Sequence, residues 1–158
     1  EAAFANFRGP KSNTTLNAIR PLQDAMGMFI LGRVFERNPG LKLCCVEADA
    51  GWVPHFIQKM DWQYHRGRHW RGLPSLERLP SEFFKEHIYV TFQDDKVVMD
   101  SVDNMNVDRL MWASDFPHND STWPHSEETF HRITVNLDDD QKARIFHRNV
   151  VDLYRLPI

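Results

Sequence analysis

The segment 110-LMWASDFPHNDSTWPHS-126 opens with a short apolar run that ends abruptly at Asp115. Two histidines, two prolines and a second tryptophan follow within eleven residues. The apolar run predicts a strand over 109–114, because strands that are covered on both faces are apolar almost throughout. The loop after it combines aromatic and polar side chains, which is typical of a pocket wall as much as of a core.

Two more apolar runs, 41–46 and 88–92, predict strands of the same kind. Helical signals lie before, between and after the three predicted strands. The predicted helices are 14–37 with a kink or restart at Pro21, 53–65, 81–86, one capped by Ser126, and a last one that begins with a capping box at Asp138 and Gln141. The segment 66–80 is predicted to be a long loop, and 96–106 a short helix or loop. Strands that alternate with helices indicate an α/β fold with a parallel sheet.

Composition excludes several kinds of partner. The 158 residues are 42% hydrophobic and 26% charged, and the formal net charge is −3 with both signs mixed along the chain. No basic stripe is present, so we expect no nucleic-acid partner. No apolar run approaches the roughly 20 residues that span a bilayer, so we expect no membrane segment. Cys44 and Cys45 are predicted to point to opposite faces of a strand and to stay reduced, as in a cytoplasmic protein.

Each predicted strand is followed by acidic residues. Glu47 and Asp49 follow the first, Asp94 and Asp95 the second, and Asp115 the third. Parallel α/β folds bind ligands at the carboxyl ends of their strands, so these acids are candidates for a functional site. Acids also favour turns and helix N-caps. We therefore interpret Asp94 and Asp95 first as turn residues, leave Asp49 open between the two roles, and take Asp115 as the main candidate.

Five stretches resemble one known family. The first three are WASDFPH (112–118), STWPHS (121–126) and IFHRNVVDLYRL (145–156), which together resemble the end of the amidohydrolase-related family. Two more, NPGLKLCCVEADAGWVPHFIQKMD (38–61) and SEFFKEHIYVTFQDD (81–95), resemble its sixth-strand and seventh-strand regions. This family contains metal-dependent (β/α)8-barrel hydrolases and decarboxylases, such as those similar to aminocarboxymuconate-semialdehyde decarboxylase. The resemblance implies the C-terminal part of a TIM-type barrel.

The resemblance also implies a catalytic metal site. In the family, the aspartate that ends the eighth strand binds a catalytic divalent metal and helps to activate its water, and this role falls on Asp115. A carboxylate suits Zn or Mn, and one beside metal-bound water can accept its proton. Glu47 stands where the decarboxylases tend to have a histidine, and it is expected to orient a metal ligand or to bind a polar group of the substrate. His118 is the third candidate catalytic residue.

Four further residues are expected to line the pocket and contact the substrate: Trp52, Phe92, Trp123 and His125. The substrate is expected to be a small carbonyl or carboxylate compound. Hydrolysis and decarboxylation both stay open, because Glu47 departs from the pattern of the decarboxylases.

The chain lacks part of the family pattern. The family's other metal ligands are an H-x-H pair at the first strand and a histidine at the fifth, and no H-x-H occurs here. Residues 1–158 are therefore expected to form a single partial domain, the C-terminal half of the barrel. Its partner is expected to be the N-terminal half of the barrel or another copy in a homo-oligomer. The alternative is a non-catalytic, truncated paralogue that serves as a binding or oligomerisation module. An unrelated open α/β domain is disfavoured because no Gly-rich phosphate loop is present.

Overall fold

The structure is a computed structural model that describes residues 14–73 and 75–158, with side chains described from residue 19 onward. Strands and helices alternate along the chain, as the sequence predicts. The elements are α1 (Thr14–Leu31), α2 (Val34–Arg37), β1 (Leu43–Cys45), α3 (Val53–Gly67), α4 (Pro80–His87), β2 (Ile88–Phe92), α5 (Lys96–Asp100), β3 (Leu110–Trp112), α6 (Ser126–Ile133), α7 (Asp139–Ala143) and α8 (Asn149–Tyr154), with 3-10 turns at Val102–Asn104 and Val107–Arg109 and a π turn at Arg144–Arg148. None of the helices described is both long and apolar enough to cross a membrane.

The three strands form one parallel sheet in the order β1-β2-β3. Cys45 pairs with Val90, and Val90 pairs with Leu110, so the three carboxyl ends lie at the same edge. The central strand β2 has the predicted bounds. The outer two are shorter than predicted, because within the described residues each has a hydrogen-bonded neighbour on one side only.

The predicted helix 14–37 is divided, but not at Pro21. Pro21 lies inside α1, so the restart that was one of its two predicted effects does not occur there. The interruption comes instead at Gly32 and Arg33, where Arg33 adopts a left-handed φ of 59°. A Cβ on Gly32 would lie 2.4 Å from the carbonyl oxygen of Met28, so the chain can close this turn only with glycine.

Capping was predicted correctly at one helix and wrongly at another. His125, not Ser126, is the N-cap of α6, and Ser126 is the first helical residue. The capping box of α7 is present as predicted, with Asp138 accepting from the Gln141 N–H and the Gln141 side chain accepting from the Asp138 N–H. Residues 14–18 of the predicted first helix lie outside the described side chains, and residue 74 of the predicted 66–80 loop lies outside the described residues.

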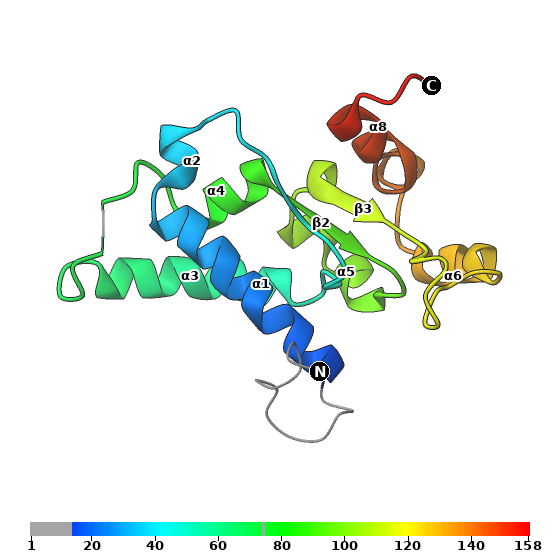
Figure 1. Ribbon diagram of the computed structural model, residues 1–158, viewed down its shortest axis with the longest axis horizontal. Coiled ribbons are helices and arrows are strands. Elements are labelled where there is room, and N and C mark those ends of the chain that lie inside the picture. Colours follow the sequence, from blue (N-terminus) through cyan, green and yellow to red (C-terminus); the bar gives the residue numbers. More distant parts are fainter. Residues whose placement is uncertain (1–13, 74) are drawn as a thin grey trace.

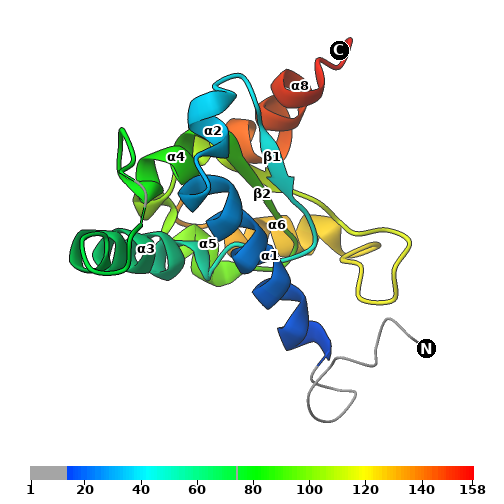
Figure 2. The same cartoon turned by 60° about the vertical axis from the view of Figure 1, so that its left-hand side comes forward.

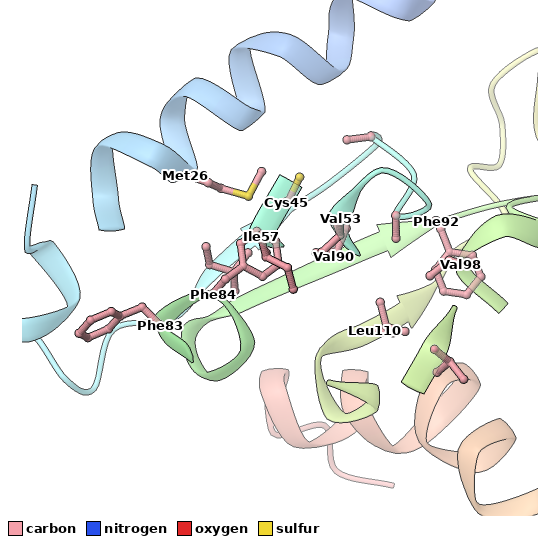
Figure 3. Packing of buried hydrophobic residues seen from close by; sticks show 14 of the residues in the cluster. Met26, Cys45, Val53, Ile57, Phe83, Phe84, Val90, Phe92, Val98 and Leu110 are labelled. Carbon is pink, nitrogen blue, oxygen red and sulfur yellow. The ribbon is translucent and has the colours of Figure 1, made fainter. Parts of the chain in front are cut away.

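The core covers one face of the sheet. Cys45, Val90 and Leu110, which stand opposite one another across the strands, are at most 2% exposed. Figure 3 shows them with Met26 of α1 and Ile57 of α3 in a single apolar cluster. Helices α1 to α4 lie toward one end of the molecule and α6 and α8 toward the other (Figure 1). This packing fixes the sheet and leaves the loops at its carboxyl edge to form a site.

Candidate active site

Three of the predicted site residues come together at the carboxyl edge of the sheet. Glu47, two residues after β1, and Asp115 and His118, shortly after β3, each offer one ligand atom, and these atoms all lie within 4.8 Å of one another. The Asp115 side chain is 16% exposed, whereas that of His118 is 59% exposed. His118 Nδ1 lies 3.0 Å from Asp115 Oδ2. Residues 71 positions apart in the chain are thus held in one cluster by the parallel pairing of the strands.

Strained backbone brings these side chains together. Glu47 (φ 58°), Asp49 (φ 51°) and Asp115 (φ 60°) are all in the left-handed region, which residues other than glycine rarely adopt. Each such residue costs about 1 to 3 kcal/mol and persists only where its surroundings hold it. The Glu47 N–H donates to Thr91 Oγ1 at 3.2 Å, which ties the turn to β2. Backbone strain of this kind clusters at functional sites, so this edge is the candidate site.

Asp49 fastens the turn after β1 to the end of β2. Its Oδ1 accepts from the Gln93 N–H at 3.3 Å. Partial burial raises the pKa of the Asp49 carboxyl and the neighbouring charges of Asp95 and Asp94 add to this, while the hydrogen bond from Gln93 acts in the opposite direction. Of the two roles that the sequence left open for Asp49, the structure shows a turn contact, and this contact supports the loop that carries Glu47.

Asp95 joins two loops of the edge. Its Oδ2 accepts from the N–H groups of Ala50 at 2.9 Å and Gly51 at 2.6 Å, and its Oδ1 accepts from Val98 N–H to cap α5. A Cβ on Gly51 would lie 2.8 Å from Asp95 Oδ1, so only glycine fits there. Asp94 forms an ion pair with Arg132 at 2.7 Å. Both acids therefore have the turn and surface roles that the sequence favoured for them.

The loop between β3 and α6 is internally hydrogen-bonded and projects from the body of the protein, in yellow in Figure 2. The Ser114 carbonyl accepts from Thr122 N–H at 3.0 Å and from Ser121 Oγ at 2.8 Å. Phe116 and Trp123 pack edge to face with ring centroids 5.1 Å apart, and each is 61% exposed. Sequence reasoning named Trp123 and missed Phe116, although Phe116 directly follows Asp115 in the S-D-F-P-H motif.

The other predicted lining residues have different surroundings. Trp52 donates its indole N–H to the Ala48 carbonyl at 2.8 Å, so it supports the loop after β1 from within. Phe92 is 2% exposed in the core, with its ring 6.4 Å from that of Phe146. His125 is exposed, with Nδ1 3.2 Å from a carboxylate oxygen of Glu128. Among the four, Trp123 and His125 are exposed in the loop of Asp115.

The donor atoms of the cluster suit a divalent metal. Two carboxylates and an imidazole are the ligand types of Zn and Mn sites. The three ligand atoms all lie within 4.8 Å of one another, and bonds of about 2.0 to 2.2 Å to one ion would require them to move closer together.

Comparisons with known proteins show a matching family and similar folds. The sequence profile described as "Amidohydrolase" matches residues 19–156. An amidohydrolase of Mycobacterium avium subsp. paratuberculosis has a similar structure, with a TM-score of 0.75, 20% identity, and coverage of 96% of this chain and 38% of that one. A comparison with curated protein sequences gave no match.

Two decarboxylases are also similar in structure. For 5-carboxyvanillate decarboxylase of Sphingomonas paucimobilis the TM-score is 0.74 with 22% identity, covering 88% of this chain and 41% of that one. For a dihydroxybenzoic acid decarboxylase of Polaromonas, solved with manganese and the inhibitor 2-nitroresorcinol, the values are 0.65 and 18%, with coverage of 95% and 43%.

The chain thus spans about two fifths of the length of these structures. Their folds confirm that it is part of a TIM-type α/β barrel, as the sequence predicts. Because the profile match covers all but the first 18 and last two residues, the chain belongs to the amidohydrolase family.

Proposed function

We propose that the chain is part of a metal-dependent enzyme that hydrolyses or decarboxylates a small carbonyl or carboxylate compound. The observation that carries this proposal is the convergence of Glu47, Asp115 and His118 at the carboxyl edge of a parallel sheet. That edge is where barrel enzymes of this architecture place their chemistry.

Asp115 is the residue proposed to hold the metal, with Glu47 and His118 beside it. A bound Zn or Mn ion supplies Lewis acidity and lowers the pKa of water at the site. With Oδ2 of Asp115 engaged by His118 Nδ1, Oδ1 is the oxygen left for the metal or for a proton. The same contact orients the His118 ring and leaves Nε2 as the atom that exchanges a proton with substrate.

The solved relatives guide the choice of first substrates. Those named above include decarboxylases of 5-carboxyvanillate and of dihydroxybenzoic acid, and another acts on 2,6-dihydroxybenzoate. Hydroxylated aromatic carboxylic acids are therefore the first compounds to test for decarboxylation, with simple esters and lactones for hydrolysis. We also propose that the remaining metal ligands come from the other part of the barrel, in the same polypeptide or in a partner chain.

The deciding experiment is metal content per chain, measured by elemental mass spectrometry together with intact mass. We expect about one divalent ion per chain, as in mononuclear catalytic sites. Asp115→Ala should remove this ion and all turnover while the unfolding midpoint stays nearly unchanged. Asp120→Ala is the matched control, because it removes an exposed acid from the same loop, and it should keep both metal and activity.

Two results would overturn the proposal. One is full turnover in Asp115→Ala. The other is a metal-free protein that gains no activity when Zn or Mn is added, and this outcome would favour the binding or oligomerisation module that the sequence left as the alternative.

A further inference from the structure

A row of exposed aromatic and basic side chains runs along the second half of α3 and the turn after it. It consists of Lys59, Trp62, Arg66, Trp70 and Arg71, and we call it the α3 row. All five residues are exposed, Trp62 by 46% and Trp70 by 70%. The first four are spaced by three or four residues, which brings them onto one side of the helix and its continuation.

The cations of the α3 row lie over its indole rings. Lys59 Nζ is 4.2 Å from the centre of the Trp62 ring, and the Arg66 guanidinium is 4.9 Å from it on the next turn. The Arg71 guanidinium is 4.5 Å from the Trp70 ring. Trp70 is itself fixed, because its indole N–H donates to the Arg66 carbonyl at 2.8 Å. Side chains held in this way lose less freedom when they bind a ligand than free ones would.

These cations have no acidic partner within the part of the chain that the structure describes. Arg132 and Arg144, by contrast, are each paired with aspartate. The segment 59–71 contains four Lys or Arg residues and one acid, Asp61, whose carboxylate accepts from the Ser81 N–H at 2.8 Å. The segment therefore carries a formal charge of +3 while the rest of the chain carries −6.

The α3 row is separate from the candidate active site. Figure 1 shows the end of α3 and the following turn projecting at one end of the long axis, while the loop between β3 and α6 lies toward the other end. Exposed indoles at such a projecting end contribute nothing to the core, and tryptophan and arginine are the residues most enriched at the centres of protein interfaces.

We propose that the α3 row is a docking surface for an acidic segment of a protein. Carboxylates of that segment pair with the guanidinium groups of Arg66 and Arg71, and its aliphatic carbons cover the indole faces between them. The rest of the chain, at −6, repels a long polyanion, whereas a short acidic segment can stay within the Debye length of about 8 Å around the row. Charge complementarity thus favours a protein segment over a nucleic acid.

The test measures the binding of a fluorescein-labelled glutamate-rich peptide to the whole chain by fluorescence anisotropy at low salt. Arg66→Gln combined with Arg71→Gln should weaken binding about tenfold, because the loss of each stacked cation is expected to reduce the affinity a few-fold. Trp70→Leu keeps an apolar side chain but removes the ring under Arg71, and it should weaken binding about threefold. The control is Lys142→Gln combined with Arg155→Gln, which removes the same charge from α7 and the end of α8 and should change affinity by less than about twofold.

Several results would overturn the proposal. They are no peptide binding at low salt, an equal loss of affinity in the control variant, or tighter binding of a single-stranded oligonucleotide of the same charge. The substitutions lie at exposed positions except Lys142, which is half-buried, and unchanged urea midpoints would show that the variants are folded.

Discussion

Asn149, the first residue of α8, allows a sharp test of how the C-terminal helices are attached to the sheet. It is 5% exposed, and its Nδ2 donates to the carbonyls of Val107 and Leu110, each at 2.7 Å. One amide group thus uses both of its hydrogens on the segment that leads into β3. Because these bonds join residues 39 and 42 positions apart in the sequence, their loss should lower the free energy of unfolding of the whole chain.

The expected cost follows from these two bonds. Asn149→Ala removes both donors and leaves the buried Leu110 carbonyl without one. At about 1 kcal/mol for each bond, and about 1 to 2 kcal/mol more for the unpaired carbonyl, the free energy of unfolding should fall by about 3 to 4 kcal/mol. Asn149→Asp keeps the shape but turns carboxylate oxygens toward two carbonyl oxygens. It should therefore be less stable than the alanine variant at neutral pH.

Urea unfolding followed by tryptophan fluorescence measures both variants, with comparison at an unchanged m value. Asn136→Ala serves as the control, since its amide donates to Asp100 Oδ1 at 3.1 Å on the surface and should cost less than about 1 kcal/mol. The reasoning is refuted if Asn149→Ala costs no more than this control, or if Asn149→Asp is the more stable of the two variants.

Three further outcomes are expected. Glu47→Gln should reduce turnover far more than metal content if Glu47 acts on the substrate, and equal losses of both in the same samples would instead make it a ligand. The pKa of Asp49 is raised in the folded protein, so ionisation of this carboxyl lowers the free energy of unfolding as pH rises above the ordinary value of 3.8. Asp49→Asn tolerates the same left-handed backbone and should therefore become more stable relative to the parent as pH rises. A stability difference that is constant across pH would contradict this. Burial, with a smaller effect from the neighbouring Cys44, raises the pKa of the Cys45 thiol to about 12. Brief alkylation at pH 8 should therefore leave Cys45 unmodified in the intact protein. Peptide mass spectrometry that found Cys45 labelled without unfolding would refute this expectation.

The sequence was most informative where one local signal determines a structure. The apolar run 88–92 became β2 with the predicted bounds. The capping box at Asp138 needs only residues three positions apart, and it formed as predicted. At α6 the same reasoning failed, because Ser126 bonds sideways to Thr122 Oγ1 and the helix begins one residue earlier than a serine cap would require.

The candidate site was predictable in part. Parallel strands must bring their carboxyl ends to one edge, so Glu47 and Asp115 could be grouped from the strand pattern together with the family motif. The left-handed backbone at both residues could not be predicted, because only glycine signals that conformation strongly. Trp52 and Phe92 were assigned to the pocket by proximity in sequence, whereas the structure shows one in a hydrogen bond under its loop and the other in the core.

The clasp between Asp95 and the Ala50–Gly51 backbone has a consequence for how this edge can diversify. In barrels of this type the loops after the strands usually vary independently, and this is how one scaffold accommodates many chemistries. Here the loop after β2 holds the loop after β1 by two backbone N–H groups, and the fit excludes even a methyl group at Gly51. An exchange of one of these loops therefore requires a matching exchange of the other, so the two are expected to vary together.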